Sequence, residues 1–131
     1  MGSISLKQFQ DQVSELLLRH RSILDVLSKY QQSNAATNRA IIKSITECGC
    51  IEVHATKQTF APNLTLEQAK ELLDTHLTGQ LCDNCQDIIA SEIGKNLFYL
   101  ASLCNLLQLD LESIISKESD KCSTLGLFNL S

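Results

Sequence analysis

Two closely spaced cysteine pairs constrain this chain more than any other feature of its sequence. The first pair is Cys48-Gly49-Cys50, and the second, Cys82-Asp83-Asn84-Cys85, follows after a segment long enough to fold back. Each pair can present two thiolates from one short turn, and a fold that brings the two turns together builds a tetrahedral sulfur site. The chain is therefore expected to place residues 48–50 beside residues 82–85.

Thiolates are preferred ligands of Zn²⁺, and four of them complete a closed structural site. The pattern therefore predicts that Cys48, Cys50, Cys82 and Cys85 bind a structural zinc ion. An iron–sulfur cluster uses the same ligands. A redox-active CxxC pair is a further alternative, although such pairs usually stand in a strand–helix context that this sequence lacks. The four residues could also be ordinary cysteines near helix ends.

The remaining cysteines and the histidines are expected to have other roles. Cys104 lies in an apolar run and is predicted to pack in the core, whereas Cys122 lies in a polar segment and is predicted to be a free surface thiol. His54 and His76 flank the two pairs and could replace a cysteine ligand, but each is expected to be a surface histidine. His20 is expected to be partly buried and hydrogen-bonded across a helical bundle.

The scarcity of helix-breaking residues favours a helical fold. The chain has 131 residues, one Pro and five Gly, and 44 % of its residues are hydrophobic. A chain of this length fits one domain, and so few breakers favour long helices over a turn-rich β fold. We therefore expect an all-α protein, with a single domain over residues 1–131 folded as an antiparallel bundle of about four to five helices.

Apolar periodicity predicts where these helices lie. They are expected to span approximately residues 5–32, 35–47, 66–76, 83–109 and 111–117. The first carries a leucine-rich heptad seam, which favours a homo-oligomer, either a dimer or a larger assembly. The C-terminal tail, approximately residues 123–131, has apolar residues without a helical period. It is expected to lie on the bundle or on a second subunit.

Local signals predict how the helices begin and end. Ser33-Asn34 supplies cap-type residues and is expected to separate the first two helices. Gly49 can adopt the left-handed conformation that ends the second helix. Asp110 is expected to cap the last one. These signals place the first cysteine pair directly after a helix.

The segment between the cysteine pairs is expected to hold a short strand and one capped helix. Residues 51–55 alternate between apolar and polar side chains, which is the period of a strand. Thr65 and Gln68 form a capping-box pattern at the start of a helix. Thr78-Gly79 is expected to end that helix, so that the second cysteine pair opens the next one.

The distribution of charged and apolar residues disfavours two classes of partner. The formal net charge is −4 and there is no basic block, so no nucleic-acid partner is expected. No segment approaches the roughly 18 uninterrupted apolar residues of a membrane span, and the first residues lack the pattern of a signal peptide. We therefore expect a cytoplasmic protein with no membrane partner, in a compartment that keeps thiols reduced.

The later helix carries a family resemblance. Residues 92–104, which continue through 109–115 to Lys117, resemble the C-terminal half of MazG-like nucleotide pyrophosphohydrolases. The family pattern is a Glu–x–x–Asp helix with an apolar face, followed by a short Asp-Leu-Glu helix that ends in lysines. The tail 124–130 and the cysteine pairs are also similar to those of short, degenerate MazG-like proteins of clostridia. The resemblance implies the family's all-α fold.

The same resemblance implies a chemistry whose residues are only partly present. The family holds Mg²⁺ with carboxylates from two helices and hydrolyses nucleoside triphosphates with release of pyrophosphate. Glu92 matches the first carboxylate of the later helix, but Lys95 replaces the expected Asp and favours a salt bridge at i, i+3. Glu47 is the one acid in the second helix. Glu47 and Glu92 are therefore remnant candidates, too few for a family-type Mg²⁺ site.

Three functional hypotheses follow. The first is a non-catalytic MazG-like helical protein with a structural zinc site, in which a nucleotide is a further candidate ligand. The second is a Mg²⁺-dependent nucleoside triphosphate pyrophosphohydrolase with a reorganised site. The third is a redox sensor that releases zinc when its thiols are oxidised.

Overall fold

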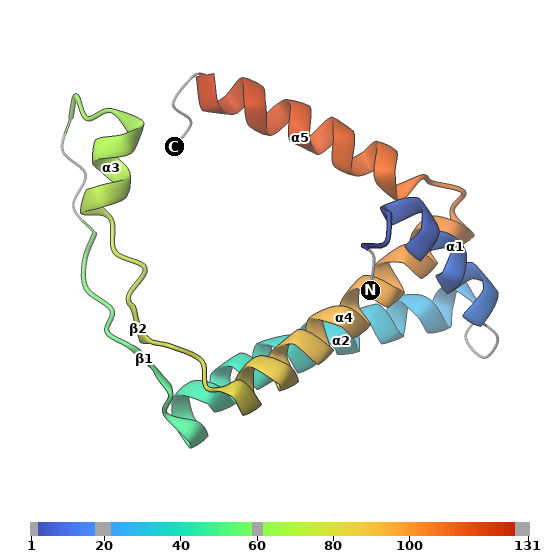
Figure 1. Ribbon diagram of the computed structural model, residues 1–131, viewed down its shortest axis with the longest axis horizontal. Coiled ribbons are helices and arrows are strands. Elements are labelled where there is room, and N and C mark those ends of the chain that lie inside the picture. The colour runs from blue at the N-terminus through green and yellow to red at the C-terminus, as the bar shows by residue number, and fades with distance from the viewer. Residues whose placement is uncertain (1–2, 18–21, 59–61, 128–131) are drawn as a thin grey trace.

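The computed structural model describes residues 3–17, 22–58 and 62–127. Most of these residues are helical, as expected, and two short strands add a small antiparallel sheet (Figure 1). In chain order the elements are α1 (Leu6–Leu16), α2 (Ile23–Lys43), the π-helical turn η1 (Ser44–Cys48), β1 (Ile51–Val53), α3 (Leu66–Leu72), β2 (Leu77–Gly79), α4 (Asp83–Leu106) and α5 (Leu111–Leu127).

Helices α2 and α4 lie side by side and run in opposite directions (Figure 1). Midway along the pair, Asn96 Nδ2 donates hydrogen bonds to Ser33 Oγ, at 3.0 Å, and to Asn34 Oδ1. The Ser33 hydroxyl in turn donates to the Tyr30 carbonyl at 2.8 Å. The prediction that Ser33-Asn34 separates two helices is therefore wrong: these polar groups are satisfied between α2 and α4, and α2 continues through them.

The single long helix expected at the N-terminus is instead two helices. Helix α1 ends at Leu16, and α2 begins at Ile23, where the Ser22 side chain accepts a hydrogen bond from a backbone N–H of the first turn. This cap ends the continuous seam that the heptad pattern indicated. Leu16 and Leu27, which the heptad period of residues 5–32 includes, are exposed. His20 lies outside the described residues.

The main core lies where α1 crosses the C-terminal half of α4 and the start of α5. Its side chains are Phe9, Val13, Phe98, Ala101, Cys104 and Leu111. Cys104 is buried there, as predicted. We call this region the corner.

A buried glutamine fastens α1 to the corner. Gln10 Nε2 donates to the Leu109 carbonyl at 2.8 Å, and Gln10 Oε1 accepts from the Leu111 backbone N–H at 2.9 Å. Asn105 Nδ2 donates to the Gln10 carbonyl at 3.0 Å. One side chain thus satisfies backbone groups that the turn between α4 and α5 leaves unpaired, which is why a glutamine is tolerated in this buried position.

Helix α5 is longer than the sequence indicated. Asp110 Oδ2 accepts from the Ser113 backbone N–H at 3.3 Å, so the predicted cap is present. The helix continues to Leu127, so residues 123–127 are helical, whereas the tail was expected to be non-helical. Residues 128–131 lie outside the described part. Cys122 is exposed on α5, as predicted for a surface thiol.

Helix α5 turns sharply away from α4, with a bend of 107° between them. Within the described residues, no single helix combines the length and the apolarity of a membrane span, and only this bent pair meets that test when its two helices are taken together.

The predicted apolar face of α4 is only partly buried. Ile89 and Cys104 are buried, but Ile93, Leu97 and Leu107 are exposed. Within the described residues, α1 covers the C-terminal part of α4, whereas the N-terminal half packs against α2 and, at its start, lies beside η1 (Figure 1). A pattern of apolar residues could predict the helix but not how many neighbours it has.

Candidate metal centre

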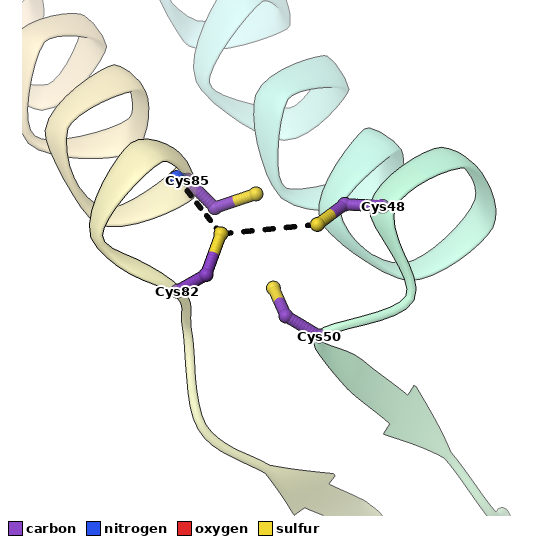
Figure 2. A group of neighbouring side chains, drawn as sticks. All are labelled: Cys48, Cys50, Cys82 and Cys85. Carbon is purple, nitrogen blue, oxygen red and sulfur yellow. Dashed lines mark hydrogen bonds between the residues drawn. The ribbon is translucent and has the colours of Figure 1, made fainter.

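The two cysteine pairs meet at the end of the α2–α4 pair that lies opposite the corner (Figure 2). Cys48 is the last residue of η1 and Cys50 precedes β1, whereas Cys82 caps α4 and Cys85 lies in its first turn. The four Sγ atoms all lie within 4.8 Å of one another. The expectation that the two turns converge is thus confirmed, and the four sulfurs could hold a metal ion.

The spacing of the sulfurs suits a tetrahedral ion better than a disulfide. Cys48 Sγ and Cys82 Sγ are 3.8 Å apart. Zn–S bonds of about 2.3 Å in a tetrahedron place the sulfurs about 3.8 Å apart, whereas a disulfide requires about 2 Å. All four residues are free cysteines. A small contraction of the widest pair would complete a tetrahedral set of four ligands.

The first pair is positioned by an unusual helix end. The five residues of η1 close a π-helical turn, in which the Gly49 backbone N–H donates to the Ser44 carbonyl at 2.9 Å. Gly49 has the predicted left-handed conformation, with φ of 79°. Cys50 Sγ then lies 3.8 Å from the same carbonyl. The turn therefore aims both Cys48 and Cys50 at the start of α4. Single π turns are often found at functional sites.

The second pair uses the N-terminus of α4. Cys82 is the N-cap, and its Sγ accepts a hydrogen bond from the Cys85 backbone N–H at 3.4 Å. This N–H lowers the pKa of Cys82 to about 7. The neighbouring Cys82 side chain, together with burial, raises the pKa of Cys85 to about 12. Near neutral pH the cluster thus offers one readily formed thiolate, and binding a cation would displace the protons of the others.

Gly79 is a site residue whose role the sequence did not indicate. It lies in β2, opposite Ile51 of β1, and has φ of +90°. A Cβ atom at this position would lie 2.5 Å from the Cys50 carbonyl oxygen. Only glycine allows the two strands to approach so closely at the base of the sheet. One feature of the sequence could have indicated this role: Gly79 stands three residues before Cys82.

The prediction that Thr78-Gly79 ends the preceding helix is therefore wrong. Helix α3 begins with the predicted capping box of Thr65 and Gln68, but it ends at Leu72. Thr78 and Gly79 belong to β2, which pairs with β1. The short strand predicted after the first cysteine pair is present as β1. Its partner, β2, contains the residues that were predicted to end a helix.

Neither flanking histidine belongs to the sulfur cluster. His54 Nε2 is 3.0 Å from Glu52 Oε2, and both side chains are largely exposed. Gln58 Nε2 donates to His76 Nε2 at 2.9 Å. Each histidine is therefore hydrogen-bonded within the segment between the two cysteine pairs, and neither belongs to the group of four sulfurs.

The two remnant carboxylates lie in different places. Glu92 forms the expected ion pair with Lys95, with Nζ 3.6 Å from Oε1. Glu47 instead lines a shallow cavity of about 270 Å³ beside Cys48, together with Lys43. In the part of the chain that the structure describes, the four cysteines are the only group of three or more Cys, His, Asp or Glu side chains close enough to share an ion.

Comparisons with protein-family models, with curated proteins and with solved structures gave no match to this chain.

Proposed function

We propose that Cys48, Cys50, Cys82 and Cys85 bind one Zn²⁺ ion, and that the protein is a non-catalytic, MazG-like helical protein in which this zinc is structural. The observation that carries the proposal is the convergence of four free thiols within 4.8 Å, with a 3.8 Å separation between Cys48 and Cys82 that fits an edge of a ZnS₄ tetrahedron. The cysteines supply all four ligands of the tetrahedral ion, which is typical of a closed structural site.

The zinc would join three elements at one point. The end of η1, the start of β1 and the start of α4 each contribute ligands. Apolar burial at this end is small, with Ile51 and Cys85 among the few buried side chains. Because ligand thiolates are brought together only in the folded chain, the free energy of zinc binding adds directly to the free energy of unfolding.

A non-catalytic role is favoured by the state of the two remnant acids. Glu92 is paired with Lys95, and Glu47 lines a cavity at the cysteine end rather than lying beside Glu92. A hard cation such as Mg²⁺ requires several oxygen ligands around one point. The resemblance of residues 92–117 to MazG-like proteins, together with the long helices, supports membership of that superfamily. Reduced thiols are best maintained in the cytoplasm, which is the compartment we propose.

The zinc site is tested by comparing cysteine variants of the full chain. Wild-type protein purified under reducing conditions is expected to hold about one zinc per chain. Cys82→Ser is expected to lose the zinc and to melt at a much lower temperature, because it removes a ligand. Cys122→Ser is the matched control: that thiol is exposed on α5, so zinc content and melting temperature should not change.

Cys104→Ser separates ligand loss from ordinary core damage, because Cys104 packs in the corner and lies outside the sulfur cluster. It is expected to lower the melting temperature while leaving the zinc content unchanged. A metal-free wild type with six free thiols, or loss of zinc in Cys104→Ser but not in Cys82→Ser, would contradict the proposal.

A further inference from the structure

The chain exposes far more surface than its mass accounts for. Its solvent-accessible area is 10182 Å² for a mass of 14.5 kDa. A compact monomer of this mass exposes about 6,900 Å², so the excess is about 3,300 Å². An obligate homodimer buries about 1,000 to 2,500 Å² per subunit. The excess is thus large enough to include a complete subunit interface.

Part of this surface belongs to a segment that projects from the cysteine end. We call this segment, residues 51–58 and 62–79, the arm; it consists of β1, α3, β2 and their connections, and it holds α3 away from α2 and α4 (Figure 1). Among the described residues, α3 has no buried side chain, and Leu72 is 62 % exposed. Val53 and Leu77, on the two paired strands, are about half exposed. Apolar side chains in a projecting arm indicate a partner surface.

A second unpartnered surface lies on α4. Ile93 and Leu97 lie one helical turn apart on the same side of α4, and they are 44 % and 46 % exposed. Ile88, on the opposite side of the helix from Leu97, is 48 % exposed. We call Ile93 and Leu97 the α4 face. A helix that is apolar on several sides is normally covered on several sides. Within the described residues, the extensive helix contacts of α4 are with α2 along its length and with α1 at the corner.

We propose that the arm of one copy packs on the α4 face of a second copy, and that the exchange is reciprocal, so that the protein is a two-fold homodimer. The arm and the α4 face are both apolar and unpartnered, and both are on the same chain. A two-fold arrangement therefore forms the same arm-on-face contact twice, and it buries the arm and the α4 face of both copies. A second copy is the occupant that accounts for both surfaces and for the area excess together.

The arm is held away from its own α4 by the way its base is built. The β1–β2 register pairs Ile51 with Gly79, and Gly79 lies against the Cys50 carbonyl. The strands therefore leave the sulfur cluster in a fixed direction, away from α2 and α4 (Figure 1). We further expect the dimer to depend on zinc, because the cysteines lie at both ends of the arm. This expectation rests on the proposed zinc site.

The test is the molar mass of the full-length, zinc-loaded protein in sedimentation equilibrium. The wild type should have twice the chain mass of 14.5 kDa. Leu72→Glu in the arm and Leu97→Glu on the α4 face should each give a monomer, with helix content and zinc content unchanged, because a buried glutamate opposes association. Leu125→Glu is the matched control, since Leu125 is similarly exposed but lies on α5. That variant should remain a dimer.

Mixing the two monomeric variants gives a sharper test. The intact arm of Leu97→Glu can pack on the intact α4 face of Leu72→Glu, so an equimolar mixture should form a heterodimer that neither variant forms alone. A monomeric wild type, a Leu72→Glu variant that remains dimeric, or dissociation caused by Leu125→Glu would overturn the proposal.

Zinc removal separates the two proposals. If the chelated wild type dissociates while the zinc-loaded protein is a dimer, both the arm and its dependence on zinc are supported. If the wild type holds no zinc but the two leucine variants still dissociate its dimer, the arm proposal is supported and the zinc site is overturned.

Discussion

The two ends of the α2–α4 pair are held together by different physical means. At the corner, Val13, Ala101 and Leu111 form an apolar core, and Gln10 satisfies the backbone groups of the adjoining turn. At the opposite end, four cysteines converge and little apolar surface is buried. The corner depends on side-chain burial, whereas the zinc that we propose would hold the cysteine end together.

This difference predicts which conditions affect each end. Apolar burial responds to the size and shape of side chains but not to metal ions. A thiolate site responds to chelators and to oxidation, because both remove the bond between sulfur and metal. With the proposed zinc bound, one helix pair would thus join a region whose stability does not depend on metal to a region whose stability does.

Chelation is expected to have the largest effect, and an effect on one end only. Removing zinc should abolish the protection of backbone amides against hydrogen exchange in β1, β2 and the first turn of α4. Protection around Val13 and Ala101 should persist, because none of the four cluster cysteines belongs to the corner core. Hydrogen exchange with mass spectrometry before and after chelation measures this. Uniform loss of protection along the chain would show that the two ends do not differ.

Truncation of a corner residue should produce the reverse pattern. Leu111→Ala should lower the free energy of unfolding by about 2–5 kcal/mol, because it leaves a cavity in the core. Leu107→Ala, at an exposed position nearby, should change it by less than about 0.5 kcal/mol. Urea unfolding of both variants, with zinc analysis, makes the comparison. A loss of zinc in Leu111→Ala would mean that the two ends are coupled.

A smaller effect is expected from the glycine at the base of the arm. Gly79→Ala should cost about 1–3 kcal/mol, because its positive φ and its contact with the Cys50 carbonyl both oppose a side chain. It should also weaken zinc binding in a competition with a chromogenic chelator.

Gly94→Ala, in the middle of α4, is the matched control for this substitution. Nothing lies within 4 Å of a Cβ at that position, so alanine should stabilise the helix by about 0.5–1 kcal/mol and leave zinc affinity unchanged. Equal effects of the two substitutions would show that Gly79 has no special role in the cysteine turn.

Signals that involve few neighbouring residues predicted structure well. The spacing of the two cysteine pairs indicated their convergence, Gly49 indicated the end of a helix, and Thr65 with Gln68 indicated the start of another. Each of these depends on local backbone geometry or on the chemistry of one side-chain type. Such properties can be recognised from a short stretch of sequence.

Features that depend on distant neighbours were not predicted. Ser33 resembled a helix cap, but its hydroxyl is bonded to Tyr30 and to Asn96, far along the chain. Gly79 resembled a helix end, but its role is set by the Cys50 carbonyl on the opposite strand. The apolar periodicity that predicted α4 includes Leu97, yet this side chain is 46 % exposed among the described residues.

X-ray absorption spectroscopy at the zinc edge, on protein purified under reducing conditions, tests whether the four cysteines bind zinc. We expect about one zinc per chain, with four sulfur neighbours at about 2.3 Å and no nitrogen or oxygen neighbour. Oxygen- or nitrogen-bound zinc, or a protein that carries no metal while all four thiols of residues 48, 50, 82 and 85 are free, would contradict it.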